Sequence, residues 1–142
     1  MVKYLIMAVI LFASFIPTAG AMASPLAPGT IKTTWLWNTS LVNSPESRNE
    51  ILEFAAEQHV SRIYLQVDPD VAVDAYRAFI KQATSLGVQI HALDGAPDWI
   101  YLDTRHRMTE TINWVKAYNR EVTEEERFTG IQMDIEPYIL PE

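Results

Sequence analysis

The sequence predicts an α/β fold, a truncated (β/α)8 TIM-type barrel in which parallel strands and helices follow the order β-α-β-α-β-α-β. Four apolar, β-branched segments alternate with three segments of helical periodicity, a pattern typical of parallel strands joined by helical crossovers. The strands are expected to begin near residues 31, 62, 88 and 129. This spacing is close to the roughly 31 residues per unit of a complete barrel of about 250 residues. Residues 24–142 therefore hold about half of such a barrel, the N-terminal half.

A flavodoxin-like or Rossmann sheet would show the same alternation. Such sheets carry a Gly-rich turn after the first strand, whereas residues 37–40 here read Trp-Asn-Thr-Ser. Acidic or amide residues also follow each predicted strand, at the edge where barrel enzymes place their chemistry. Both observations favour the half-barrel, which we expect to occupy residues 31–142.

The first strand is predicted at residues 31–36, which are β-branched and aromatic. A Pro/Gly-rich linker, residues 24–30, precedes it. Ser44 and Pro45 are an N-cap and a first helical residue, and apolar residues at helical spacing continue to about Gln58.

The second strand, residues 62–67, is expected to end before Pro69, because proline cannot donate to a strand ladder. The clearest helical periodicity covers residues 72–86, and Gly87 suits a left-handed C-terminal cap. The third strand is predicted at residues 88–93.

The third helix is predicted at residues 105–119. Residues 123–126 form a capping box that predicts one further turn, and the acidic run 124–126 is expected to be solvated. The fourth strand is predicted at residues 130–135.

The composition restricts the chemistry. The chain is 49% hydrophobic with a net charge of −7, so it is expected to be globular and to bind no nucleic acid. Cysteine is absent, which excludes a disulfide framework, a thiolate metal site and a cysteine nucleophile. His59, His91 and His106 fall on separate predicted elements without metal-ligand spacing. We expect neither a metal nor a cofactor.

The N-terminus predicts a secretory signal peptide at residues 1–23. Lys3 precedes an uncharged apolar run that Pro17 ends too early for a transmembrane span, and Ala21-Met22-Ala23 fits signal-peptidase cleavage between Ala23 and Ser24. An uncleaved anchor helix is the alternative. We expect a secreted product that does not bind the membrane after leader removal, and a cysteine-free exported chain suits a bacterium.

The fourth predicted strand contains the strongest catalytic candidates. Side chains alternate along a strand, so Gln132, Asp134 and Glu136 would share one face, directed toward the barrel axis. Burying two acids side by side raises the pKa of one, which keeps that carboxyl protonated as a general acid. The alternative is a solvated or arginine-paired acidic strand end.

Residues 129–136 resemble the signature Asp-Gly-x-Asp-x-Asp-x-Glu of glycoside hydrolase family eighteen, the chitinase-type barrels. Gly130, Asp134 and Glu136 match it, while Thr129 and Gln132 replace two of its Asp residues. The resemblance implies Glu136 as the acid that protonates the glycosidic oxygen and Asp134 as the residue that orients the substrate's N-acetyl group. It also implies a substrate-assisted mechanism, in which the acetamide is the nucleophile.

A second resemblance competes with the first. Glu136-Pro137 is similar to the Asn-Glu-Pro ending of the fourth strand in the large clan of retaining glycosidases, with Ile135 in place of Asn. From about residue 31 onward, the chain resembles the N-terminal half of a bacterial glycosidase-like barrel.

Other strand ends supply candidates for substrate binding. Aromatic rings can stack on sugars, and amides or carboxylates can bind sugar hydroxyls; core packing, turns and caps are the structural alternatives. The aromatic candidates are Trp35, Trp37, Tyr64 and Trp99, and the polar candidates are Asn38, Gln66, Asp68, Asp94 and Gln132.

Two functions remain open. The first is an exported, glycoside hydrolase-like protein that acts on a polysaccharide by general acid catalysis and is incomplete as given. The alternative is a non-catalytic truncated product, or a carbohydrate-binding half-barrel whose open edges pair with a second half-barrel or with another copy of the chain.

Overall fold

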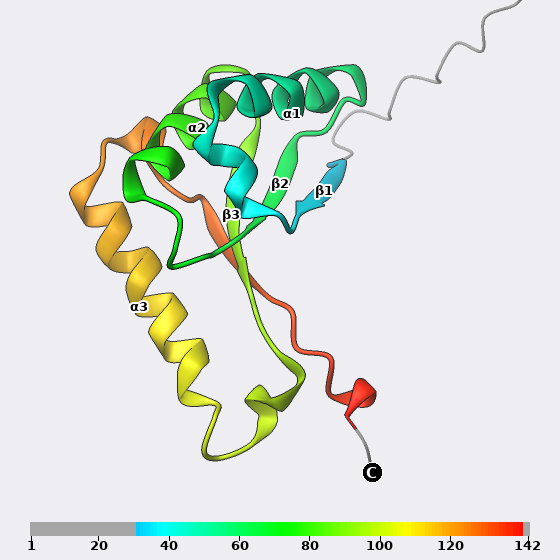
Figure 1. The fold of residues 1–142 in the computed structure, drawn as a ribbon, viewed down its shortest axis with the longest axis vertical. Coiled ribbons are helices and arrows are strands. Elements are labelled where there is room, and N and C mark those ends of the chain that lie inside the picture. The colour runs from blue at the N-terminus through cyan, green and yellow to red at the C-terminus, as the bar shows by residue number, and fades with distance from the viewer. Residues whose placement is uncertain (1–30, 141–142) are drawn as a thin grey trace, which may run out of the picture. The chain divides into compact units, whose positions relative to one another are not determined.

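The structure is a computed structural model that describes residues 31–140. The expected leader and linker, residues 1–30, lie outside the described residues. Residues 31–142 form one compact unit, and its described part contains a four-stranded parallel sheet and three α-helices (Figure 1). The expectation of an α/β fold with parallel strands and helical crossovers is confirmed.

The strands lie side by side in the order in which they occur in the chain, β1-β2-β3-β4. The observed bounds are Thr33–Leu36 for β1, Arg62–Gln66 for β2, Gln89–Asp94 for β3 and Gly130–Met133 for β4. In a doubly wound sheet the first strand lies inside the sheet and the order reverses. Here β1 is one edge and β4 is the other.

The helices are α1 (Pro45–Glu57), α2 (Val73–Ser85) and α3 (His106–Glu121). The Ser44 side chain accepts a backbone N–H from the first turn of α1, and Gly87 follows α2 with a φ of 76°. Both expected caps are therefore confirmed. Short 3-10 turns occupy Thr39–Asn43 (η1), Pro97–Ile100 (η2), Glu124–Glu126 (η3) and Pro137–Ile139 (η4).

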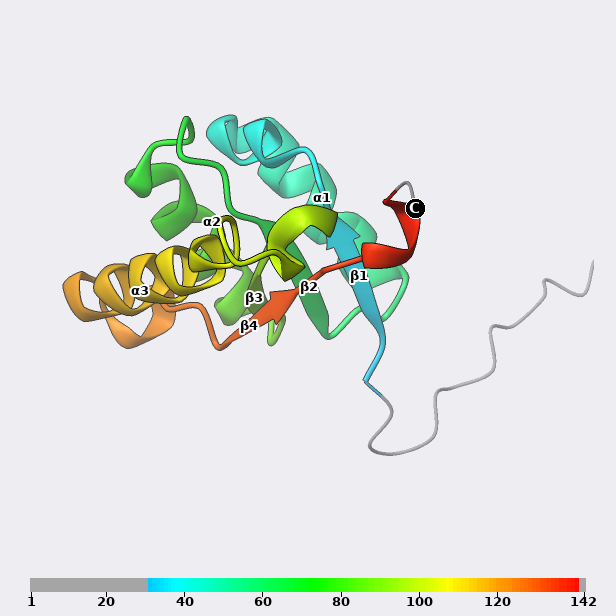
Figure 2. The same cartoon turned by 90° about the horizontal axis from the view of Figure 1, so that it is seen from below.

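All three helices cover the same face of the sheet (Figure 2). Alternate residues of the central strands, Ile63 and Leu65 on β2 and Ile90 and Ala92 on β3, are buried there. Burial of such side chains is the main favourable contribution to folding. The helical residues in this core include Leu52, Ala55, Phe79, Ile80, Ala83, Val115 and Tyr118. The other face of the sheet has no helix against it in the described part of the chain.

The acidic turn before β4 differs from the expectation of a solvated run. The capping box is present, but Glu126 is 6% exposed, and its carboxylate accepts a hydrogen bond from Arg77 Nε at 3.1 Å. Burial raises the pKa of Glu126, but hydrogen bonds from Arg77 and Thr123 and the charges of Arg77 and Lys81 outweigh it and leave the pKa below its ordinary value. Sequence periodicity missed this contact because Arg77 lies on a different helix.

Candidate functional site

The candidate acids lie where the chain leaves β4. This strand ends at Met133, not at residue 135 as expected, although the Asp134 N–H still donates to the Asp94 carbonyl at 2.9 Å. Glu136 then precedes Pro137 and η4 with φ −113° and ψ 67°, and a residue before proline is sterically restricted. The strand alternation that predicted a shared face for both acids therefore holds only as far as Asp134.

Gly95, the residue after β3, lies against the backbone of Asp134. Gly95 has a φ of 154°, and a Cβ built on it would lie 2.2 Å from the Asp134 carbonyl oxygen. Real Cβ atoms do not approach backbone this closely, so only glycine allows the two chains to lie together here. This close approach and the hydrogen bond from Asp134 to Asp94 hold the β3 and β4 exits side by side.

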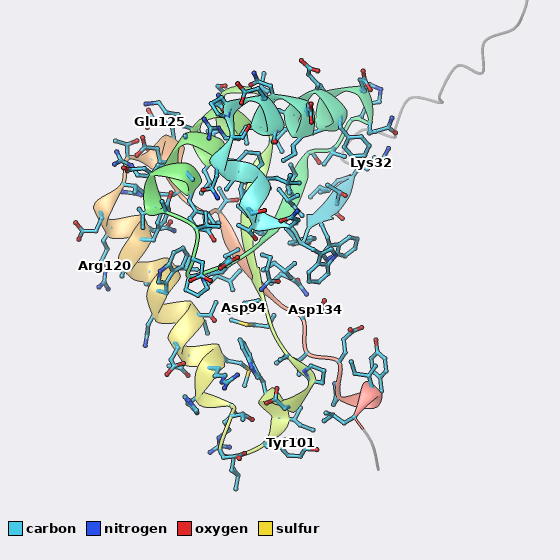
Figure 3. The ribbon with its side chains drawn as sticks, viewed as in Figure 1. Lys32, Asp94, Tyr101, Arg120, Glu125 and Asp134 are labelled. Atoms are coloured by element: carbon cyan, nitrogen blue, oxygen red, sulfur yellow. The ribbon has the colours of Figure 1, made fainter. Side chains whose placement is uncertain are left out.

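The Asp94 side chain is satisfied by protein donors. Its Oδ1 accepts from the Gly95 N–H at 2.9 Å and from Gln66 Nε2 at 3.2 Å, while its Oδ2 accepts from the Thr111 hydroxyl of α3. Asp94 and Asp134 lie at the same end of the sheet (Figure 3). These contacts support a structural role for Asp94, the alternative to substrate binding, because its carboxylate links the end of β3 to α3.

Glu136 has a partner that the sequence-based reasoning did not identify. The Tyr138 hydroxyl donates a hydrogen bond to the Glu136 carboxylate. This hydrogen bond raises the pKa of Tyr138, and the negative charges of Glu136 and Asp134 raise it further. Of the two candidate acids, Glu136 is therefore the one hydrogen-bonded to this phenol. In the sequence, the feature that could have indicated this contact is the aromatic residue two positions after Glu136.

A row of aromatic side chains crosses the face of the sheet that lacks helices. Trp35, Tyr64, His91 and Gly130 are register partners on β1 to β4. The ring centroids of Trp35 and Tyr64 are 5.7 Å apart, and those of Tyr64 and His91 are 5.6 Å apart. The His91 ring covers Gly130, where a Cβ would lie 2.5 Å from the ring.

The ends of this row differ in exposure. Trp35 is 50% exposed and Trp37, which follows β1, is 57% exposed, so both rings are open to a ligand. Tyr64 and His91 are partly buried. Burial lowers the pKa of His91, and the nearby charge of Arg62 lowers it further.

Trp99 and Asp68 adopt structural positions. Trp99, in η2, is 6% exposed, so its ring lacks the open face expected of a sugar platform, and its Nε1 has no partner among the described residues. Asp68 accepts the Asp70 N–H at 2.9 Å in a turn. The Tyr76 hydroxyl accepts a hydrogen bond from the Asp68 N–H and donates one to the Asp68 carbonyl. Burial is the main cause that raises the pKa of Tyr76 to about 12, and the charges of Asp68 and Asp94 add to it.

The remaining polar candidates lie at the surface. Asn38 accepts a hydrogen bond from the Ser40 hydroxyl at 2.6 Å in the turn after β1. Gln132 is exposed on β4, and its Nε2 donates to the carbonyl of Met133 at 3.4 Å. The structure thus pairs Glu136 with Tyr138. The side-chain hydrogen bonds of Asn38 and Asp68 given above stay within their own turns and do not reach Glu136.

Comparison with known proteins adds no relative. No protein-family model, curated protein or solved structure matches the chain. Within residues 31–140, no three acidic or histidine side chains gather as a metal site, and no helix of that stretch has the length and apolar character needed to cross a membrane.

Proposed function

We propose that the chain is the N-terminal half of a glycosidase-like (β/α)8 barrel, exported to act on a polysaccharide. The observation that carries this proposal is the sequential order of four parallel strands with all three helices on one face. A barrel has this arrangement around its whole circumference, with its chemistry at the carboxyl ends of the strands. The candidate acids follow the last strand at that end.

In this proposal Glu136 is the general acid. Its carboxyl proton passes to the glycosidic oxygen as the bond between that oxygen and the anomeric carbon breaks. Tyr138 orients the Glu136 side chain through its hydrogen bond. Asp134, two residues before Glu136, orients the acetamide of an N-acetylated sugar, which acts as the nucleophile in the mechanism that the sequence resemblance implies.

The test compares the natural protein with its Glu136→Gln and Asp134→Asn variants. Each is assayed with the remaining strands of the barrel present, supplied either by a downstream reading frame or by a separately expressed half. Glu136→Gln keeps the shape and removes the proton, so hydrolysis of an unactivated oligosaccharide should fall by about 10² to 10⁴ while binding survives. A substrate with a good leaving group should lose less. Full activity of Glu136→Gln on the unactivated substrate would end the catalytic assignment.

A second candidate function is carbohydrate binding without catalysis. The exposed rings of Trp35 and Trp37 favour it, since each offers an open apolar face to a sugar. A change in tryptophan fluorescence on addition of an oligosaccharide that is lost in Trp37→Ala, together with no hydrolysis of that oligosaccharide that depends on Glu136, would support this function over the catalytic one.

A further inference from the structure

We propose that two copies of this chain pair through their sheet edges, β4 of one copy beside β1 of the other, and close an eight-stranded barrel around a twofold axis. This inference rests on the half-barrel interpretation under the proposed function, and it names the partner that completes the half.

The first argument is the composition of the two edge strands. Strand β1 reads Thr-Thr-Trp-Leu and β4 reads Gly-Ile-Gln-Met, so neither strand contains a charge or a proline. Proteins that keep an edge strand solvated commonly protect it by making it very short, or with lysine, proline, a bulge or a covering segment. Strands β1 and β4 are short but contain neither lysine nor proline, so within residues 31–140 their outer backbone groups can still pair with another strand.

The second argument is strand direction. All four strands are parallel, and each edge strand is four residues long. A twofold axis along the strand direction sets β4 of each copy beside β1 of the other, again in parallel. This arrangement uses both edges of both copies, so the assembly closes at two copies instead of growing into a filament. The resulting eight strands form a barrel whose interior is narrow enough for side chains to fill.

The third argument is the face that closure would cover. The row of Trp35, Tyr64 and His91 lies on the face without helices, and Trp35 stands half exposed at the β1 edge. In the closed barrel this row becomes interior, and Trp35 lies at the new junction beside β4 of the second copy. The apolar surface that a single copy leaves in water then becomes core.

Closure also changes the candidate site. The twofold axis puts a second Asp134 and a second Glu136 at the same rim of the barrel, because both copies point their strands in one direction. The assembled rim then carries two Glu136 carboxyl groups facing a shared opening, whereas a single copy offers one pair of acids beside an open edge.

The experiment begins with sedimentation of the protein expressed from the full 142-residue sequence, at concentrations from about 1 to 100 µM. We expect a dimer, and we expect Trp35→Lys to be monomeric where the wild type is dimeric. Phe54→Lys is the matched control, because Phe54 is 51% exposed and lies on α1, not on an edge strand. Trp35 is 50% exposed, so neither substitution should unfold a single copy, and circular dichroism checks this. A monomeric wild type, or equal dissociation of both variants, would overturn the proposal.

Cysteine cross-linking tests which edges meet, since the natural chain has no cysteine. Thr33 and Gln132 lie on the edge strands with side chains on the face without helices. Thr33→Cys mixed with Gln132→Cys should give the mixed disulfide dimer in preference to either homodimer, and Glu50→Cys on exposed α1 should give none with Gln132→Cys. Homodimers of Gln132→Cys in equal yield would show that like edges meet, which contradicts the proposed closure.

These outcomes are separable from the proposed function. If the chain forms the closed dimer but no Glu136-dependent hydrolysis is found, the pairing is supported and the catalytic assignment is refuted. A monomer that hydrolyses or binds oligosaccharide would do the reverse.

Discussion

Replacement of Gly95 by alanine tests how the candidate acids are positioned. A Cβ at this residue would lie 2.2 Å from the Asp134 carbonyl oxygen, and 2.6 Å and 2.8 Å from its carbonyl carbon and amide nitrogen. The φ of 154° adds strain for any residue other than glycine. Backbone strain costs about 1–3 kcal/mol, and forcing extra volume into a packed contact costs about 1–3 kcal/mol. We therefore expect Gly95→Ala to lower the free energy of unfolding by about 2–6 kcal/mol.

Gly87→Ala is the matched control, because Gly87 also has a positive φ, of 76°, but has no atom within 4 Å of a built Cβ. Its cost should be that of the backbone conformation alone, about 1–2 kcal/mol. Urea unfolding followed by circular dichroism measures both, and an unchanged slope with denaturant shows that only stability changed. A cost for Gly95→Ala no larger than that for Gly87→Ala would refute the close approach between the β3 and β4 exits.

Two further predictions concern the sheet and its supports. Gly130→Ala should cost about 1–3 kcal/mol, because its Cβ would lie 2.5 Å from the His91 ring; the double variant with His91→Ala should recover most of that cost, and additive costs in the double-mutant cycle would contradict the contact. Glu126→Gln should be less stable than wild type at neutral pH, because the folded-state pKa of Glu126 is lowered by Arg77. A lowered pKa stabilises the fold above the ordinary carboxyl range, and this contribution disappears as pH falls through the lowered pKa. Thermal unfolding from pH 7 to pH 3 should therefore show the two proteins converging, and a constant difference across that range would argue against the ion pair.

The elements that the sequence predicted well are those with local signals. Ser44 caps α1 and Gly87 ends α2 because a cap depends on a few neighbouring residues. The elements it predicted less well depend on contacts distant in the sequence. Trp99 is buried by tertiary packing that a loop sequence does not reveal, and Glu126 is buried because Arg77 reaches it from another helix.

The same distinction applies to the candidate site. Strand periodicity predicted Asp134 and Glu136 on one face of a strand that reaches residue 135, but β4 ends at Met133 and Glu136 lies at the start of a 3-10 turn. The contact of Tyr138 with Glu136 and that of Thr111 with Asp94 were not predictable from spacing. Each depends on where the chain turns after it leaves the sheet, which is a property of the assembled strands.

Two glycines along the β3–β4 pair, Gly95 just after β3 and Gly130 on β4, allow close packing at the strand exits and on the face without helices. Gly95 lets the β4 exit lie against the β3 exit, and this contact fixes the backbone of Asp134. Gly130 leaves room for the His91 ring, so the aromatic row from Trp35 continues to the last strand. A larger side chain at residue 95 would displace the backbone of Asp134. A larger side chain at residue 130 would displace the His91 ring and so disturb the aromatic row. The position of the acids and the surface proposed to meet a second copy therefore both depend on close packing along the β3–β4 pair.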